Sequence, residues 1–323
     1  MKINNLADGI IGFALGDAFG VPYEFRTREE MNRVSNIQEM IGYGTYNVPK
    51  GTWSDDTSMT LATIDSIVQQ GKINTEDIAK KFLKWFRKNE YTATGNAFDI
   101  GRTTFQALAQ YELNLEKAVD CGQTGEMDNG NGSLMRMLPI AYYIYYKGIK
   151  DCKEIYEIVK DVSSITHAHE VSILGCYIYV NLVVQLLNGE KSVDAHKKIK
   201  ELDYGFFSKN SLTRYERILK GRIEDLRYQE LKSSGYIVDT LECVFWLFLN
   251  SNNYNQTIIR AVALGGDTDT IAACVGGLVG IYYGIESIDE NWKKELKRYD
   301  YIINLCEKFD NAYIGKENRK SEK

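Results

Sequence analysis

Apolar residues recur at helical spacing along most of the chain. In the segment TEDIAKKFLKWFRKN, residues 75–89, the apolar positions 78, 82, 85 and 86 lie on one helical face. Acidic residues occupy its first turn, where they interact favourably with a helix N-terminus. The pattern predicts an amphipathic helix that buries one face.

The segment HEVSILGCYIYVNLVVQLLNGE, residues 169–190, is apolar nearly all round, which predicts a helix at the core of a bundle. Alternating period-two runs bounded by hairpin turns are hard to find, and three prolines leave room for many uninterrupted helices. We therefore expect an all-α fold. Further helices are predicted at residues 57–70, 134–147, 151–164, 236–249, 255–264, 269–283 and 289–309.

The chain shows no Pro-, Ser- or Gly-rich linker and no internal repeat, so we expect a single domain over residues 1–314. The tail GKENRKSEK, residues 315–323, is charged and lacks apolar anchors, which predicts disorder. Glycine-bearing loops near residues 42–54, 93–101 and 121–133 are the long connections. In a helical domain such loops commonly carry the functional site.

Composition narrows the class of protein. Residues are 44% hydrophobic and 26% charged, as in ordinary globular proteins, and the net charge of −5 does not favour nucleic-acid binding. The six cysteines are scattered without a C-x-x-C pair, which is typical of reduced thiols. The N-terminus lacks the features of a signal peptide, and residues 271–284 are too short to span a bilayer. We expect a soluble, cytoplasmic protein without a membrane partner.

Two clusters of oxygen-bearing side chains stand behind glycines at predicted helix starts. One is ALGGDTDTIAA, residues 263–273, and the other is GTWSDDTSM, residues 51–59. Helix capping is one interpretation, since Ser, Thr and Asp are favoured N-cap residues. A cap needs only one side chain, however, and each cluster offers three or four. A cation held between the clusters is the alternative, because crowded carboxylates destabilise a fold unless positive charge offsets them.

The ligand chemistry limits which metal such a site would hold. Oxygen ligands without His or Cys favour Mg²⁺, Mn²⁺ or Ca²⁺ over zinc or copper. An EF-hand loop starting at Asp267 would need Glu where Leu278 stands. A terpene-synthase-like pair of motifs would need acids at Met59 and Cys274. Neither motif fits.

Six short sequence motifs follow one another along the chain in a fixed order. Together they resemble the motifs of the ADP-ribosylglycohydrolase family, which includes the dinitrogenase-reductase-activating glycohydrolases. The resemblance runs from about residue 6 to residue 285, and the aspartate blocks and NGSLMR are its most specific parts. The blocks are GFALGDAFGVPYEF (12–25), GTWSDDTSM (51–59), TGNAFDIGRTT (94–104), NGNGSLMRMLPIA (129–141), SITHAHE (164–170) and GGDTDTIAACVGGLVGIYYG (265–284).

The resemblance implies a compact, single-domain orthogonal helical bundle with a two-metal cleft that holds Mg²⁺ or Mn²⁺. Asp269 is the residue we expect to bridge both ions. The metal ligands implied by the matching motifs are Ser54, Asp55, Asp56, Asp267, Asp269 and Thr270.

The resemblance also implies the remaining site residues. Glu24, Asp55 and Asp56 are the expected catalytic carboxylates, although a solvated loop residue is the other interpretation of Glu24. Asp17 is expected to be structural, and His169 to be a core or capping residue. The expected substrate-binding residues are Gly95, Asn96, Asn131, Gly132, Ser133 and His167.

The reaction implied is hydrolysis of a glycosidic bond at the anomeric carbon of ADP-ribose, which reverses ADP-ribosylation of a protein side chain or another conjugate. Cleavage at an anomeric carbon passes through an oxocarbenium-like state flanked by carboxyl groups. Two alternatives stay open: hydrolysis of a free small-molecule ADP-ribose derivative or ribosyl amide, and a non-catalytic ADP-ribose-binding or crystallin-like relative. Nucleic acid is expected only as an ADP-ribosylated substrate. The oligomeric state stays open, with a monomer as the simpler expectation.

Overall fold

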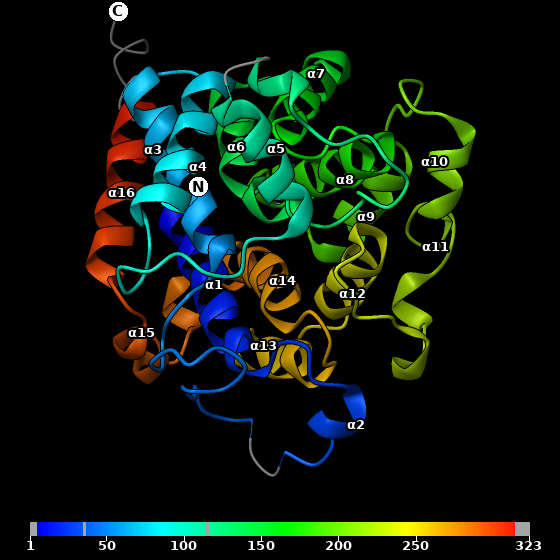
Figure 1. Ribbon diagram of the computed structural model, residues 1–323. Coiled ribbons are helices and arrows are strands. Elements are labelled where there is room, and N and C mark those ends of the chain that lie inside the picture. The colour runs from blue at the N-terminus through cyan, green and yellow to red at the C-terminus, as the bar shows by residue number, and fades with distance from the viewer. Residues whose placement is uncertain (1–4, 35–36, 114–116, 314–323) are drawn as a thin grey trace, which may run out of the picture.

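The computed structural model describes residues 5–34, 37–113 and 117–313, and the regular elements of these ranges are all helical (Figure 1). The predicted all-α fold is confirmed. The α-helices are α1 Leu6–Gly20, α2 Arg28–Met31, α3 Asp55–Gln70, α4 Thr75–Lys88, α5 Arg102–Glu112, α6 Leu138–Lys147, α7 Cys152–Ser164, α8 Glu170–Leu187, α9 Ser192–Lys200, α10 Lys209–Arg214, α11 Glu216–Leu219, α12 Ile237–Leu249, α13 Tyr254–Ala263, α14 Thr268–Tyr283, α15 Glu290–Glu295 and α16 Tyr299–Tyr313. Short 3₁₀ turns connect them: η1 Val21–Tyr23, η2 Ala118–Asp120, η3 Leu134–Arg136, η4 Ile223–Asp225, η5 Tyr228–Glu230 and η6 Ile285–Ser287.

Helices α1 and α14 form the centre of the molecule, with backbones in direct contact (Figure 1). A Cβ atom on Gly12 would lie 2.4 Å from the Gly276 carbonyl oxygen, and one on Gly16 would lie 2.1 Å from the Ala272 carbonyl oxygen. Only residues without side chains allow this approach. The close packing brings the C-terminal end of α1 against the first turn of α14.

Helix α8 confirms the prediction of a core helix at residues 169–190. By length and composition it could cross a membrane, with a mean hydropathy of 1.6, but 89% of that window is buried inside the protein. Such burial is typical of a core helix in a soluble bundle. In Figure 1, α3 and α16 lie together at one edge of the molecule, while α10 and α11 lie at the opposite edge.

Two predicted helices are each divided in the structure. Residues 289–309 form α15 and α16, because α15 ends at Glu295, where Leu296 takes an extended conformation, and α16 begins only after Arg298, which has a φ of +55°. Residues 134–147 form η3 followed by α6, because Pro139 lacks a backbone N–H and is tolerated only in the first turn of a helix. The six cysteines all lie in the described residues and form no disulfide bonds there. The predicted disordered tail lies outside the described residues.

Candidate metal centre and substrate cavity

A cavity of about 240 Å³ opens where the starts of α3, α5 and α14 meet the end of η1. It contains most of the residues that the sequence singled out. Its lining is Glu24, Phe25, Asp55, Asp56, Asp99, Gly101, Arg102, Thr103, Thr104, Gly130, Asn131, Gly132, Met135, His167, Gly235, Asp267 and Thr270.

Carboxylates from four separate segments converge on this cavity. Oxygens of Glu24, Asp99 and Asp269 all lie within 4.8 Å of one another, and so do oxygens of Asp17, Asp56 and Asp269. Asp269 belongs to both groups. It lies in the first turn of α14 and is 1% exposed, so its carboxylate is held deep between the other acids.

Asp17 is structural, as the sequence suggested. From inside α1 its carboxylate accepts hydrogen bonds from the backbone N–H groups of Ser54 and Thr57, at 2.9 and 3.0 Å, and from the Thr57 hydroxyl at 2.6 Å. These N–H groups belong to the N-terminus of α3, where no intrahelical partner is available. Asp17 therefore ties α1 to the turn that presents Asp55 and Asp56.

Burial changes the protonation of these acids. It raises the pKa of Glu24 to about 10, with the charges of Asp99 and Asp267 contributing further. Burial is also the main reason that the pKa values of Asp55, Asp56 and Asp269 lie well above the usual range, since an ionised carboxylate loses hydration and meets like charges. Without added positive charge, the cluster therefore favours protonated acids.

Several of these oxygens have no protein donor. Glu24 Oε2, Asp56 Oδ2 and Asp267 Oδ1 are buried without a hydrogen-bond partner among the described residues. A buried carboxylate oxygen without a donor is costly in free energy. Oxygen-only donors at this spacing are the ligand type of Mg²⁺, Mn²⁺ or Ca²⁺. The residues present therefore fit divalent cations.

The opposite wall of the cavity comes from the loop before η3. Asn131 Nδ2 donates to Asp267 Oδ2 at 2.8 Å and to the Thr240 hydroxyl at 3.0 Å, so this side chain orients a carboxylate. A Cβ atom on Gly132 would lie 2.9 Å from His167 Cε1, so only glycine leaves this wall open. Burial lowers the pKa of His167 to about 3, which keeps the imidazole neutral. Its Nδ1 lies 2.7 Å from the Thr166 hydroxyl.

Three expected substrate contacts lie elsewhere in the structure. Gly95 and Asn96 are exposed and do not line the cavity, and the Gly95 N–H donates to the Thr92 hydroxyl at 3.1 Å. The Ser133 hydroxyl points into the core, 3.3 Å from Cys176 Sγ, because its helical turn directs the side chain away from the cavity. The geometry gives these side chains no contact with the cavity.

Two other predicted residues, Ser54 and Thr270, form hydrogen bonds with Asp56 at the start of α3, and Ser54 is the N-cap of this helix. The Ser54 hydroxyl accepts a hydrogen bond from the Asp56 N–H at 3.3 Å, and the Thr270 hydroxyl lies 3.5 Å from Asp56 Oδ1. His169 caps α8 by accepting from the Val171 N–H, which confirms its capping interpretation. Capping uses one lone pair of the Ser54 oxygen, so the same atom can also face a cation.

Asp99 is the site residue that sequence reasoning missed. It lies in the block TGNAFDIG, has a φ of +66°, and accepts a hydrogen bond from the Tyr46 hydroxyl. Burial raises its pKa. Strained backbone is common at functional sites. An acidic residue two positions before the glycine that starts α5 was the available signal, because aspartate tolerates a left-handed conformation.

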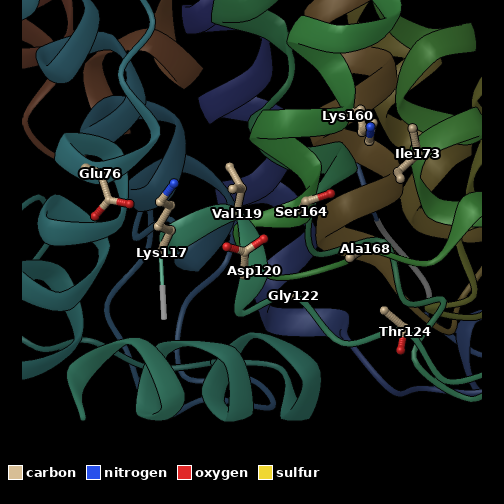
Figure 2. A pocket seen from close by; sticks show the side chains of 10 residues that line it. All are labelled: Glu76, Lys117, Val119, Asp120, Gly122, Thr124, Lys160, Ser164, Ala168 and Ile173. Atoms are coloured by element: carbon tan, nitrogen blue, oxygen red, sulfur yellow. The ribbon is translucent and has the colours of Figure 1, made fainter. Parts of the chain in front are cut away.

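A larger hollow, of about 960 Å³, lies elsewhere and is shown in Figure 2. It is lined by Glu76, Lys117 and Lys160 among others. The Glu76 carboxylate already accepts hydrogen bonds from the Tyr111 hydroxyl and the Ala118 N–H. Among the described residues, the lining of this hollow contains no cluster of acids that could hold a metal ion, so it does not offer the chemistry of the smaller cavity.

Known proteins share both this sequence and this fold. The family model for ADP-ribosylglycohydrolase matches residues 2–319. The ADP-ribosylarginine hydrolase Tri1 of Serratia proteamaculans (strain 568) is 30% identical over 309 residues, which cover 95% of this chain and 79% of that protein. The ADP-ribosyl-[dinitrogen reductase] glycohydrolase of Rhodospirillum rubrum is 28% identical over 289 residues, 88% of each chain.

A solved structure described as an ADP-ribosylglycohydrolase-related protein complex has the same fold, with a TM-score of 0.79 and 24% identity. The match covers 97% of this chain and 99% of that one. The whole-length family match and the acidic cavity agree with each other. The chain belongs to the ADP-ribosylglycohydrolase family.

Proposed function

We propose that this protein is a metal-dependent hydrolase that removes ADP-ribose from arginine side chains. The observation that carries the proposal is the set of unpartnered, buried carboxylate oxygens at one cavity. The arginine linkage is supported by the Serratia relative, which is named an ADP-ribosylarginine hydrolase.

Two divalent cations, Mg²⁺ or Mn²⁺, are the proposed cofactors. Asp269 is the proposed ligand of both ions, because its carboxylate lies within 4.8 Å of Asp56 in one group of acids and of Glu24 and Asp99 in the other. We assign Asp55, Asp56, Asp267 and Thr270 as further ligands, with Ser54 as a candidate through its free lone pair. When bound, the cations supply positive charge that offsets the acids, orients ribose hydroxyls and acidifies water.

The bond changes are those of hydrolysis. The oxygen of water bonds to the anomeric carbon, the bond from that carbon to the guanidine nitrogen breaks, and the electron pair stays on this nitrogen. Asp55 or Asp56 accepts the proton of the attacking water. Glu24 assists the departing nitrogen, which takes up a proton.

The wall that carries Gly132 and His167 supports binding of the ribose. Because its Nδ1 lies against Thr166, His167 is left with Nε2 to contact a hydroxyl group. Gly130 and Gly132 leave the wall free of side chains where the sugar approaches. The proposed binding residues are therefore Asn131, Gly132 and His167.

The experiment is a comparison of substrates on the purified protein. Release of ADP-ribose is measured from ADP-ribosyl-arginine, from an ADP-ribosyl-serine peptide and from ADP-ribosylated nucleic acid, in Mg²⁺, in Mn²⁺ and after chelation. We expect the arginine conjugate to be cleaved fastest and chelation to abolish turnover. ADP-ribose binding without turnover of any conjugate would replace the proposal by a non-catalytic reader. Turnover of free small-molecule derivatives alone would point to the small-molecule hydrolase.

A further inference from the structure

Phe25 is the large apolar residue most exposed to solvent in the lining of the acidic cavity. It follows Glu24 directly, is 67% exposed, and has a φ of +64°. This left-handed conformation is unfavourable for a bulky side chain. A hydrogen bond of 2.7 Å from the Phe25 N–H to the Gly266 carbonyl holds it, together with one of the same length from the Gly266 N–H to the Arg26 carbonyl.

Packing within the protein does not explain the position of this ring. The neighbouring guanidinium of Arg26 lies over the Tyr23 ring, 5.3 Å from its centroid. Across the residues that the structure describes, no aromatic ring or cation is paired with Phe25. The backbone therefore stores strain and presents an aromatic face at the cavity mouth without an internal partner.

Within the described part of the chain, the face of the Phe25 ring is not covered by a cation of the protein itself. Five carboxylates line the same cavity, and Arg102 is the cationic side chain among the lining residues. Arg102 is already paired with Asp128, at 2.9 Å. A planar cation entering the mouth would meet a free aromatic face, and guanidinium groups stack on such faces.

We propose that Phe25 stacks on the guanidinium of the arginine that carries ADP-ribose and so makes this protein selective for the arginine linkage over hydroxyl linkages. The inference rests on the proposed hydrolase function. Phe25 is a specificity-determining residue in this assignment. It is adjacent in the chain to Glu24, the residue assigned to the departing nitrogen. One short segment therefore acts on both the glycosidic bond that is cleaved and the guanidinium group next to it.

The test compares Phe25→Leu, which keeps apolar bulk but removes the ring, with Phe25→Tyr, which keeps the ring. Tyr43→Leu is the matched control, because Tyr43 is 68% exposed, has a φ of +58° and does not line the cavity. KM and kcat are measured on ADP-ribosyl-arginine and on an ADP-ribosyl-serine peptide, and melting temperatures verify folding.

We expect Phe25→Leu to raise KM for the arginine substrate roughly 5- to 30-fold, the loss of one cation–π contact, with kcat changed by less than about twofold. Activity on the serine peptide should not change, and Phe25→Tyr and Tyr43→Leu should match the wild type. Equal losses on both substrates, or no loss, would overturn the role of Phe25 while leaving the hydrolase function intact. Absence of wild-type turnover on every conjugate would overturn the hydrolase function, and this inference with it.

Discussion

Substituting Gly20 by alanine tests whether the contact of α1 with α14 positions the metal-binding acids. A Cβ atom at this position would lie 2.4 Å from Asp269 Cα, 2.5 Å from the Asp269 nitrogen and 2.5 Å from the Thr268 carbonyl oxygen. All three neighbours are backbone atoms in the first turn of α14. No rotation of a side chain can relieve the overlap.

The displacement follows from these distances. Ordinary van der Waals contact begins at 3.4 Å, so the first turn of α14 must move by about 1 Å relative to α1. Overpacking of this kind costs about 1–3 kcal/mol, and the gain of about 1 kcal/mol in helix propensity only partly offsets it when backbone must move. A net loss of up to about 2 kcal/mol would lower the melting temperature of this 323-residue chain by up to about 3 °C.

The effect on turnover should be larger than the effect on stability. A shift of about 1 Å in a catalytic group costs about 10²-fold in rate, and Asp269 moves with the turn that carries it. We therefore expect kcat/KM on ADP-ribosyl-arginine to fall about 10²-fold, with weaker binding of Mn²⁺ by calorimetry. Both measurements are made on protein whose folding has been verified by circular dichroism.

Gly277→Ala, in α14, is the control. Its nearest neighbours are side-chain atoms, Leu138 Cδ2 at 2.9 Å and the Tyr179 hydroxyl at 3.3 Å, which can move by small rotations. We expect less than about 1 kcal/mol change in stability and turnover within about twofold. If Gly20→Ala behaved like this control, the close approach of α1 would not be what holds Asp269 in place.

Four further outcomes are expected. Chelation should lower the melting temperature, because ions that bind only the folded state stabilise it, and zinc held by cysteines would contradict the oxygen-only site. Asp269→Asn should fold, since it removes a charge from a buried acidic cluster, but should lose bound metal by calorimetry and most turnover; a wild-type rate in saturating metal would reduce Asp269 to a cap. Glu24→Gln should lower turnover by about 10²–10⁴-fold while ADP-ribose affinity by calorimetry survives, whereas equal losses would make Glu24 a binding or metal-holding residue. In metal-free protein the melting temperature should fall as pH rises from 5 to 8, because folded Glu24, with a pKa raised from 4.5 to about 10, keeps its proton while the unfolded chain loses it. Added cation should reverse this fall more strongly at pH 8 than at pH 5, and a flat pH profile would contradict the raised pKa.

Much of the fold could be predicted because the signals are local. The periodicity of residues 75–89 predicted α4 within one residue at its end, and the apolar segment at 169–190 was identified as the core helix α8. Sequence patterns did not predict the break between α15 and α16, because this break depends on the backbone conformation of single residues. The extended backbone of Leu296 and the φ of +55° at Arg298 separate α15 from α16, and neither residue type is a helix breaker that a sequence would reveal.

The site was predictable in part for the same reason. The acids at positions 55, 56, 267 and 269 stand in two recognisable clusters, and the structure brings both clusters together. Asp99 was missed because its block suggested a glycine loop for phosphate, whereas the fold turns its carboxylate towards Glu24 and Asp269. The direction in which a loop side chain points depends on its φ and on the helices that pack beside it.

The sequence by itself determined the chemistry that is available: helices with buried faces, oxygen ligands at two helix starts, and no soft ligands beside them. Only the tertiary structure decided which acids share one cavity. Residues 24, 55, 99 and 267 are far apart in the chain, and no local preference draws like charges together. They converge because α1 contacts α14 through glycines and because Asp17 caps α3, contacts whose free energy outweighs the cost of burying the acids.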